Sequence, residues 1–185
     1  MAETKTAARY TYADYQALPD DGPRYELIGG ELIMAAAPLT RHQLVLMCLI
    51  RLLDGFVRSH RLGTVICAPI DVHLSDHDVV QPDIIFVATV HADRIARVGI
   101  EGPPDLCVEI LSEGTRKRDL DRKRRLYADH GVEEYWIFDP DADTAAVYRL
   151  RENPEKPVAT FARTDTMTSA MFPGLEIGLA EVFER

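Results

Sequence analysis

Two neighbouring stretches decide the fold of this chain: Leu106-Cys107-Val108-Glu109-Ile110-Leu111 and Asp119-Leu120-Asp121-Arg122-Lys123-Arg124-Arg125-Leu126-Tyr127. The first is almost entirely apolar, which is typical of a strand covered on both faces of its sheet. The second predicts a helix that ends at Gly131. At about 100° per residue, Leu120, Leu126 and Tyr127 share one apolar face of this helix, and Lys123 falls in the middle of it. A buried ammonium group is costly without a partner, so the sequence predicts acids that face Lys123.

Asp83 and Glu109 are the candidate partners, because both lie in apolar runs upstream of the helix. Pro82 cannot donate to a strand ladder, so strand pairing is expected to break just before Asp83. A single acid in a strand more often forms a structural ion pair than a catalytic site. Two acids on neighbouring strands, followed by an inward lysine, favour a metal-dependent site that cleaves phosphodiesters.

The chemistry of such a site suits Mg²⁺, with Mn²⁺ as a substitute. Mg²⁺ takes oxygen ligands and keeps several waters, so Asp83 and Glu109 would suffice to hold it, and the backbone carbonyl of Ile110 could add a third ligand. The metal would polarise the scissile phosphate and lower the pKa of a bound water. Lys123 would orient that water and stabilise the charge that develops in the transition state.

The remaining elements follow from periodicity and turn residues. Before the two deciding stretches, we expect a helix over 11–18, a hairpin over 24–34 that turns at Gly29-Gly30, a helix over 40–60, and strands over 64–74 and 79–89. Thr40 and Gln43 match a capping box at the start of the second helix. The strand of residues 105–112 and the Lys123 helix come next, followed by strands over 134–138 and 145–150 and a C-terminal appendage over 151–185. This order predicts one α/β domain over 1–185, with a mixed sheet and a core of about residues 24–150.

Composition and charge narrow the class of protein. With 46% hydrophobic residues and no apolar run near the roughly 20 residues that span a membrane, a globular protein without a membrane anchor is expected. Cys48, Cys67 and Cys107 are isolated in apolar runs, which is typical of reduced core cysteines in a cytoplasmic protein. The net charge of −9 argues against a protein that coats nucleic acid with its whole surface.

A basic run stands out in this acidic chain, since residues 116–125 carry seven basic and two acidic side chains. One interpretation is a solvated helix face. The other is that Arg116, Lys117 and Arg118 contact the phosphates of a nucleic acid, because the run lies beside the candidate catalytic acids. The sequence leaves both open.

The same residues carry a resemblance to a known family. The matching stretches are Arg24-Tyr25-Glu26-Leu27-Ile28-Gly29-Gly30-Glu31-Leu32, Val80-Gln81-Pro82-Asp83, Val108-Glu109-Ile110-Leu111-Ser112, Glu134-Tyr135-Trp136 and Asp139-Pro140, together with His42, Lys123 and Tyr127. Over about residues 10–150, the chain resembles the PD-(D/E)XK nuclease superfamily and, in finer pattern, its Uma-type family of restriction endonucleases. The resemblance implies a restriction-endonuclease-like core of helix, three strands, helix and strand. It also implies a Mg²⁺-dependent endonuclease that acts on DNA. Another phosphodiesterase or an RNase stays an alternative, because a metal site of this kind recognises phosphate and not sugar.

The chain departs from the superfamily pattern at one catalytic position. The superfamily has a lysine two residues after the second acid, where this chain has Leu111. Residues 109 and 111 share a strand face, so the usual lysine would stand beside the metal carboxylate. The family resemblance and the helical pattern both indicate that Lys123 replaces it from the following helix.

Several further residues are second-tier candidates. Glu31 resembles an N-terminal acid that contributes to such sites, and His42 lies on the inward stripe of its helix. Tyr127 is expected to pack beside Lys123, and Ser112 to position Glu109 or cap the next loop. A structural role for Glu31 or His42, as a hydrogen-bonded polar group, is an equal alternative.

The sequence is compatible with two main classes of function. The first is a Mg²⁺-dependent DNA endonuclease, in which two-site cleavage of both strands implies a homodimer by analogy. The second is a non-catalytic nucleic-acid-binding or regulatory module that keeps the nuclease fold. The presence of both acids and the inward lysine favours the enzyme, whereas the acidic total charge favours the module.

Overall fold

The structure is a computed structural model that describes residues 9–19, 21–35 and 37–184. Its helices are α1 (Tyr12–Gln16), α2 (Thr40–His60), α3 (Arg124–Asp129) and α4 (Leu179–Val182), with a 3₁₀ segment η1 (Thr89–Arg94) and a π-helical turn η2 (Arg118–Lys123). The strands are β1 (Tyr25–Ile28), β2 (Glu31–Met34), β3 (Gly63–Cys67), β4 (Val72–Ser75), β5 (Asp78–Val80), β6 (Ile84–Ala88), β7 (Ile95–Ala96), β8 (Gly99–Glu101), β9 (Leu106–Ile110), β10 (Glu134–Asp139), β11 (Thr144–Arg149), β12 (Ala159–Ala162), β13 (Thr166–Met167) and β14 (Ile177–Gly178).

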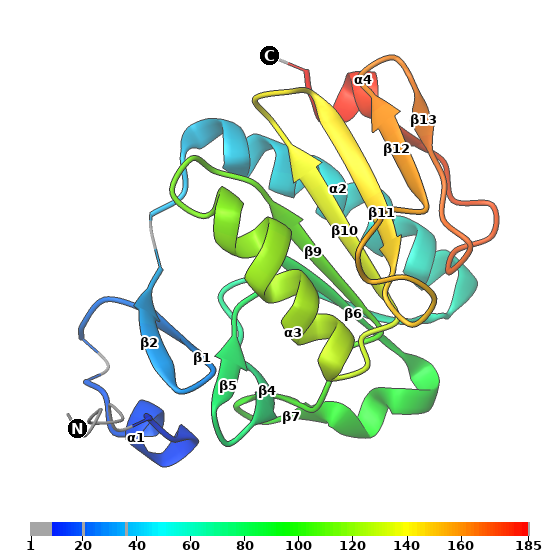
Figure 1. Cartoon of the computed structure of the whole chain (residues 1–185). Coiled ribbons are helices and arrows are strands. Elements are labelled where there is room, and N and C mark those ends of the chain that lie inside the picture. Colours follow the sequence, from blue (N-terminus) through cyan, green and yellow to red (C-terminus); the bar gives the residue numbers. More distant parts are fainter. Residues whose placement is uncertain (1–8, 20, 36, 185) are drawn as a thin grey trace.

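Two sheets organise these elements. The main sheet has the strand order β12-β11-β10-β9-β6-β3, and the N-terminal sheet has the order β2-β1-β5-β4-β8-β7. In the main sheet, β9 pairs parallel with β10 and antiparallel with β6. Helix α2 crosses behind the main sheet and α3 lies in front of it (Figure 1). The predicted α/β architecture with a mixed sheet is therefore confirmed.

Alternation along β9 sends its side chains to two separate cores. Val108 and Ile110 pack in the core on the α2 side, whereas Cys107 packs with Tyr127 in the core on the α3 side. Glu109 shares the face of Cys107, so it points toward α3. The sheet therefore places the carboxylate of Glu109 in an otherwise apolar layer.

The N-terminal hairpin forms as the sequence indicated. Gly29 and Gly30 have φ angles of 60° and 78°, the left-handed region in which glycine carries no steric cost. The turn joins β1 to β2, and β1 also pairs with β5, so that β1 lies inside the N-terminal sheet while β2 is at its edge.

The two long strands predicted over 64–74 and 79–89 are each broken into two. The first becomes β3 and β4, and the second becomes β5 and β6, with one half of each in either sheet. Prolines lie at both breaks, Pro69 in the first and Pro82 in the second. Because proline has no N–H to donate, the ladder stops there and the chain passes to the other sheet.

The C-terminal segment is part of the core and not the appendage that the sequence predicted. Strand β12 extends the main sheet beside β11. Phe172 and Phe183 are fully buried on the α2 side. These aromatic side chains cover the part of that sheet face that α2 leaves open. The sequence of this loop-rich segment has no periodic pattern that would predict such packing.

Two local predictions about helices were wrong. Helix α2 begins at Thr40 with Leu39 as its N-cap, so Thr40 is already helical and makes no capping box with Gln43. Leu120, predicted to face inward, is 37% exposed, while Asp119 is buried. The π-helical turn explains this, because its wider turn rotates the residues before Lys123 relative to an ordinary α-helix.

Cys67 is exposed instead of buried in the core, whereas Cys107 is buried as expected. Within the described ranges, no helix is long and apolar enough to cross a membrane.

Candidate active site

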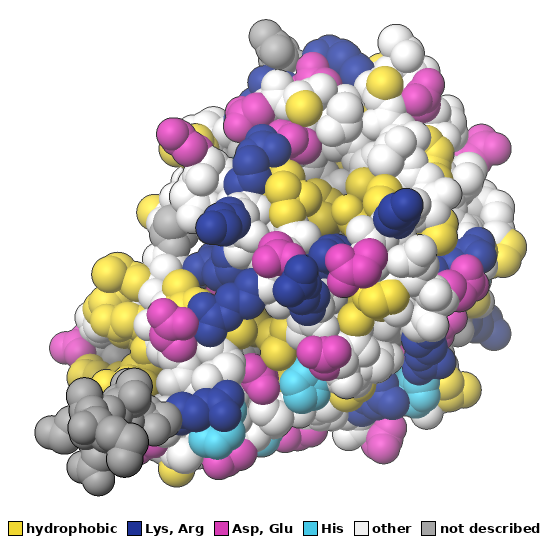
Figure 2. Space-filling view, in the orientation of Figure 1, with side chains coloured by type: hydrophobic (Ala, Val, Ile, Leu, Met, Phe, Trp, Pro, Cys, Tyr) yellow, Lys and Arg dark blue, Asp and Glu magenta, His cyan; other side chains and the backbone are white. Residues whose placement is uncertain are grey.

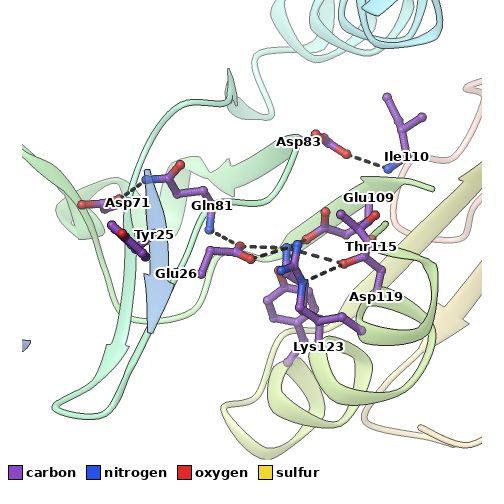
Figure 3. Close-up of polar contacts among 12 residues, drawn as sticks. Tyr25, Glu26, Asp71, Gln81, Asp83, Glu109, Ile110, Thr115, Asp119 and Lys123 are labelled. Carbon is purple, nitrogen blue, oxygen red and sulfur yellow. Dashed lines mark hydrogen bonds and ion pairs between the residues drawn. The ribbon is translucent and has the colours of Figure 1, made fainter. Parts of the chain in front are cut away.

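A cavity of about 600 Å³ opens where the two sheets, α2 and η2 meet. Its lining includes Asp83, Glu109, Ile110, Ser112 and Lys123, and therefore brings together most of the residues selected from the sequence. Glu26 from β1 and His42 from the first turn of α2 complete the polar wall. Figure 3 shows Glu26, Glu109 and Asp119 converging on Lys123, with Asp83 nearby beside Ile110.

Lys123 is the centre of a buried ion network. Its Nζ lies 2.8 Å from Glu109 Oε1, 2.8 Å from Glu26 Oε1 and 3.7 Å from Asp119 Oδ1. The lysine side chain is only 3% exposed. Burial would lower the pKa of Lys123, but the three negative charges outweigh burial and raise this pKa above its ordinary value. The acids around Lys123 therefore favour its charged form.

Asp83 is held by two donors on one of its oxygens. Its Oδ2 accepts a hydrogen bond of 2.7 Å from the backbone N–H of Ile110, and lies 3.2 Å from His42 Nε2. Among the described residues no donor reaches Asp83 Oδ1, and this atom is not among the fully buried polar atoms. One oxygen of Asp83 therefore remains open toward the cavity.

Glu109 shows the same division between its two oxygens. Oε1 accepts from Lys123 Nζ and from the hydroxyl of Tyr127, both at 2.8 Å. For Oε2, the described part of the chain supplies no hydrogen bond, and this atom too is not fully buried. Asp83 and Glu109 thus each offer one oxygen on the same cavity. Carboxylate oxygens are ligands that a hard divalent cation prefers.

The charges around Lys123 leave negative charge in excess. Among the described residues, the cations that pair with Glu26, Glu109 and Asp119 are Lys123 and Arg118. Arg118 lies 3.4 Å from Glu26 and 3.7 Å from Asp119. Burial, together with the charges of Asp119, Asp83 and Glu26, raises the pKa of Glu109 well above its ordinary value, against the opposing effect of Lys123. Glu26 is also buried, yet Lys123 and the N–H of Gln81 lower its pKa. A cation near Glu109 would relieve this excess.

The site fits a metal with few protein ligands. No group of three or more His, Cys, Asp or Glu side chains that could hold a metal ion is found in the part of the chain that the structure describes. A cation between Asp83 and Glu109 would therefore take the rest of its ligands from backbone and water. Mg²⁺ commonly binds in this way, through one or two carboxylates.

The second-tier residues fall at different distances from the acids. His42 contacts Asp83 directly and Tyr127 contacts Glu109 directly. Ser112 lines the cavity, but its hydroxyl lies 3.0 Å from Thr115 Oγ1 and caps the loop that follows β9. Of the two roles considered for Ser112, the structure favours the loop cap.

Glu31 is not brought to this cavity. Its side chain is 67% exposed and forms an ion pair of 2.7 Å with Arg122. Glu26, five positions earlier on β1, takes the place expected for Glu31. The sequence does contain a signal for Glu26, because an acid in the apolar strand Tyr25–Ile28 follows the same rule that selects Asp83 and Glu109.

The basic run of residues 116–125 is largely neutralised within the protein. Six of its seven basic side chains form ion pairs, as Arg116–Asp139, Arg118–Glu26, Arg122–Glu31, Lys123–Glu109, Arg124–Glu155 and Arg125–Asp121. Figure 2 shows basic and acidic side chains interspersed over this face. Lys117 is exposed and has no ion pair with any described acid. The run as a whole is therefore closer to a compensated surface than to a positive patch.

Comparison with known proteins gives consistent results. Residues 12–180 match the sequence profile of Uma2, described as "Putative restriction endonuclease". A crystal structure described as "a putative nuclease belonging to DUF820", from Anabaena variabilis ATCC 29413, is similar with a TM-score of 0.78 and 21% sequence identity, over 94% of this chain and 97% of that chain. At this identity the structural similarity supports the fold. No curated protein gives a significant match.

Proposed function

Because this chain belongs to the Uma2 family, we propose that it is a metal-dependent endonuclease that hydrolyses phosphodiester bonds in DNA. The observation that carries the proposal is the pair of open carboxylate oxygens on Asp83 and Glu109. They lie on one cavity, next to a buried lysine, in a region with excess negative charge. A binding module would have no need to keep such a costly arrangement buried.

Asp83, Glu109 and the carbonyl of Ile110 would hold the metal, with Mg²⁺ or Mn²⁺ as the ion. When bound, the ion would polarise the scissile phosphate and lower the pKa of the attacking water. His42 would fix the orientation of Asp83, since both the histidine and the N–H of Ile110 bind the same oxygen, Oδ2. The other oxygen is thereby aimed in one direction.

Lys123 would act in two ways at this site. It holds Glu109 at 2.8 Å, and its charge would stabilise the additional negative charge of the transition state. Glu26 would keep Lys123 in place from β1 in the N-terminal sheet, at the same distance of 2.8 Å. We therefore assign to Glu26 the supporting role that the family resemblance gave to Glu31.

Cleavage of supercoiled plasmid tests this proposal. Wild-type protein is incubated with plasmid in EDTA, in Mg²⁺ and in Mn²⁺, beside Asp83→Asn and the matched control Glu31→Gln. We expect metal-dependent cleavage by wild type and by the control, and none by Asp83→Asn. Linear product formed without a nicked intermediate would support a homodimer whose two sites cut both strands.

Titration of Mg²⁺ by calorimetry separates the enzyme from the binding module. We expect binding by the wild type and the Glu31→Gln control, and its loss in Asp83→Asn. A protein that binds DNA without metal, cleaves no nucleic acid and shows no Asp83-dependent metal binding would instead be the non-catalytic module.

A further inference from the structure

A second cavity continues from the acid-lined cavity. It has a volume of about 340 Å³ and shares Arg24 and Gln81 with the first, together with Gly22 and Pro23. Its distinctive lining is aromatic, with Tyr12, Tyr15 and Tyr25. None of these three tyrosines takes part in the acid cluster.

Gln81 ties the two cavities together. Its backbone N–H donates to Glu26 Oε1 at 2.9 Å, on the acid side. Its side-chain amide donates to Asp71 Oδ1 at 2.7 Å, on the tyrosine side. Figure 3 shows this chain of contacts running from Asp71 through Gln81 to Glu26. A group bound among the tyrosines would therefore lie at a fixed position relative to the candidate metal ligands.

The tyrosine rings are held as platforms. The hydroxyl of Tyr15 donates to Asp71 Oδ1 at 2.9 Å, which fixes the ring. Tyr12 is nearly parallel to Tyr15, with 20° between the ring planes and 6.5 Å between centroids. His73 stacks against Tyr12 at 3.9 Å, so that ring is supported from one side. Both tyrosines remain partly exposed. Positioned aromatic rings of this kind bind nucleobases by stacking.

Arg24 provides charge at the rim that the two cavities share. It is exposed and forms no ion pair with a described acidic side chain, in contrast to most of the basic run of residues 116–125. A free guanidinium at this place suits a backbone phosphate between one nucleotide and the next.

We propose that the tyrosine-lined cavity binds an unpaired nucleobase adjacent to the phosphate in the acid cavity, so that the preferred substrate is single-stranded or locally unpaired DNA. This inference rests on the proposed nuclease function. It adds the requirement that the base face be free, because stacking on a protein ring needs a base that has left the duplex.

Binding of a short fluorescent single-stranded oligonucleotide tests the inference. Asp83→Asn is the background in all proteins, so that no cleavage occurs, and anisotropy is measured for Tyr12→Leu, Tyr12→Phe and the control Tyr10→Leu. Tyr10 is 48% exposed and does not line the tyrosine cavity. We expect about 5- to 150-fold weaker binding for Tyr12→Leu, on the scale of one lost base stack, and unchanged binding for the other two.

An oligonucleotide with abasic positions tests the same contact without changing the protein. It should bind more weakly to the Asp83→Asn protein, and the further loss from Tyr12→Leu should disappear. A duplex of the same sequence should bind more weakly than the single strand. These measurements keep the test decisive even if a tyrosine variant folds poorly.

Two outcomes would overturn the inference in different ways. Equal binding of intact, abasic and duplex DNA by a protein that still cleaves plasmid would remove the base site and leave the proposed function. Failure to bind any nucleic acid, together with failure of the plasmid test, would remove both.

Discussion

Two ion pairs join the same hairpin to the same helical turn, yet they lie in opposite environments. Glu26 on β1 pairs with Lys123 at 2.8 Å, and both side chains are 3% exposed. Glu31 on β2 pairs with Arg122 at 2.7 Å, with exposures of 67% and 39%. The difference comes from sheet order, because β1 lies between β2 and β5 while β2 is an edge strand. Two ion pairs of similar length are therefore buried on one strand and exposed on the neighbouring strand.

The two pairs should also differ in energy. Breaking a buried pair by removing one partner leaves an uncompensated charge out of water and is strongly destabilising. An exposed pair is screened and contributes little. If the buried network is the catalytic centre, variants of the buried pair should lose cleavage rate, whereas variants of the exposed pair should keep it.

Lys123→Met should have the largest effect. It leaves Glu26, Glu109 and Asp119 without their shared cation, so the free energy of unfolding in metal-free buffer should fall by about 3–5 kcal/mol. Cleavage should fall by about 10²-fold or more, on the scale of losing one electrostatic stabiliser, while metal binding survives or tightens. Urea unfolding, calorimetry and plasmid cleavage measure the three quantities.

Lys117→Met is the matched control for this change. Lys117 lies on the same segment but is exposed, so its replacement should alter neither stability nor the cleavage rate of bound DNA. A Lys123→Met protein that is unstable without metal, yet cleaves at the wild-type rate with metal, would show that the lysine is only a structural counter-ion.

Glu26→Gln should be the next largest effect on stability. Lys123 and the N–H of Gln81 lower the pKa of Glu26, so its ionised form stabilises the fold above the ordinary glutamate pKa. That stability is lost as the pH falls through the lowered pKa. We expect a loss of about 1.5–3 kcal/mol at neutral pH and a weaker dependence of stability on acid pH. Urea unfolding between neutral and acid pH checks both.

Glu109→Gln should act in the opposite direction on the metal-free protein. Burial and neighbouring acids raise the pKa of Glu109, so its ionised form destabilises the fold as the pH rises through that raised value. The variant should therefore be more stable than wild type at neutral pH in EDTA, but should lose stabilisation by Mg²⁺. Thermal unfolding with and without Mg²⁺ measures this; a less stable variant in EDTA would contradict it.

Replacing Arg116, Lys117 and Arg118 together by alanine should change the salt dependence of DNA binding by less than three phosphate contacts would. If all three contacted phosphates, the salt slope would change by up to ~2.7, from about 0.9 for each contact. Arg116 and Arg118 are paired with Asp139 and Glu26, so we expect a change of only about 0.9, from Lys117. The slope of affinity against salt, compared with Lys117→Ala alone, checks this.

Glu31→Gln and Arg122→Gln should have the smallest effect. A double-mutant cycle should give a coupling of about 0–1 kcal/mol, and the cleavage rate should stay at the wild-type level. Lost cleavage in Glu31→Gln without a change in stability would return Glu31 to the active site and reverse the comparison with Glu26.

The sequence was most informative where local patterns decide the structure. Periodicity placed α2 and the inward Lys123, alternation oriented Glu109 toward α3, and Gly29-Gly30 fixed the hairpin. Each of these depends on neighbours within a few residues. The roles of Asp83, Glu109 and Lys123 in catalysis stay predictions until they are tested.

Two of the errors involve contacts between distant segments. Which of Glu26 and Glu31 is buried depends on the pairing of β1 with β5, about fifty residues away, and local alternation carries no such information. The burial of Phe172 and Phe183 likewise depends on α2. Leu120 was misplaced for a local reason, because the π-helical turn changes the period that the prediction assumed.

The C-terminal part of the core has a consequence for the order in which the protein is made. Phe183 belongs to the same apolar cluster as Val45 and Leu49, so residues separated by more than half the chain complete one layer. During synthesis, the strands that flank Asp83 and Glu109 emerge from the ribosome long before this cover does. A nascent chain therefore cannot close this apolar layer until Phe172 and Phe183 have left the ribosome. The walls of the candidate site would then be fully supported only in a chain that already includes these residues, and not in shorter fragments still under translation.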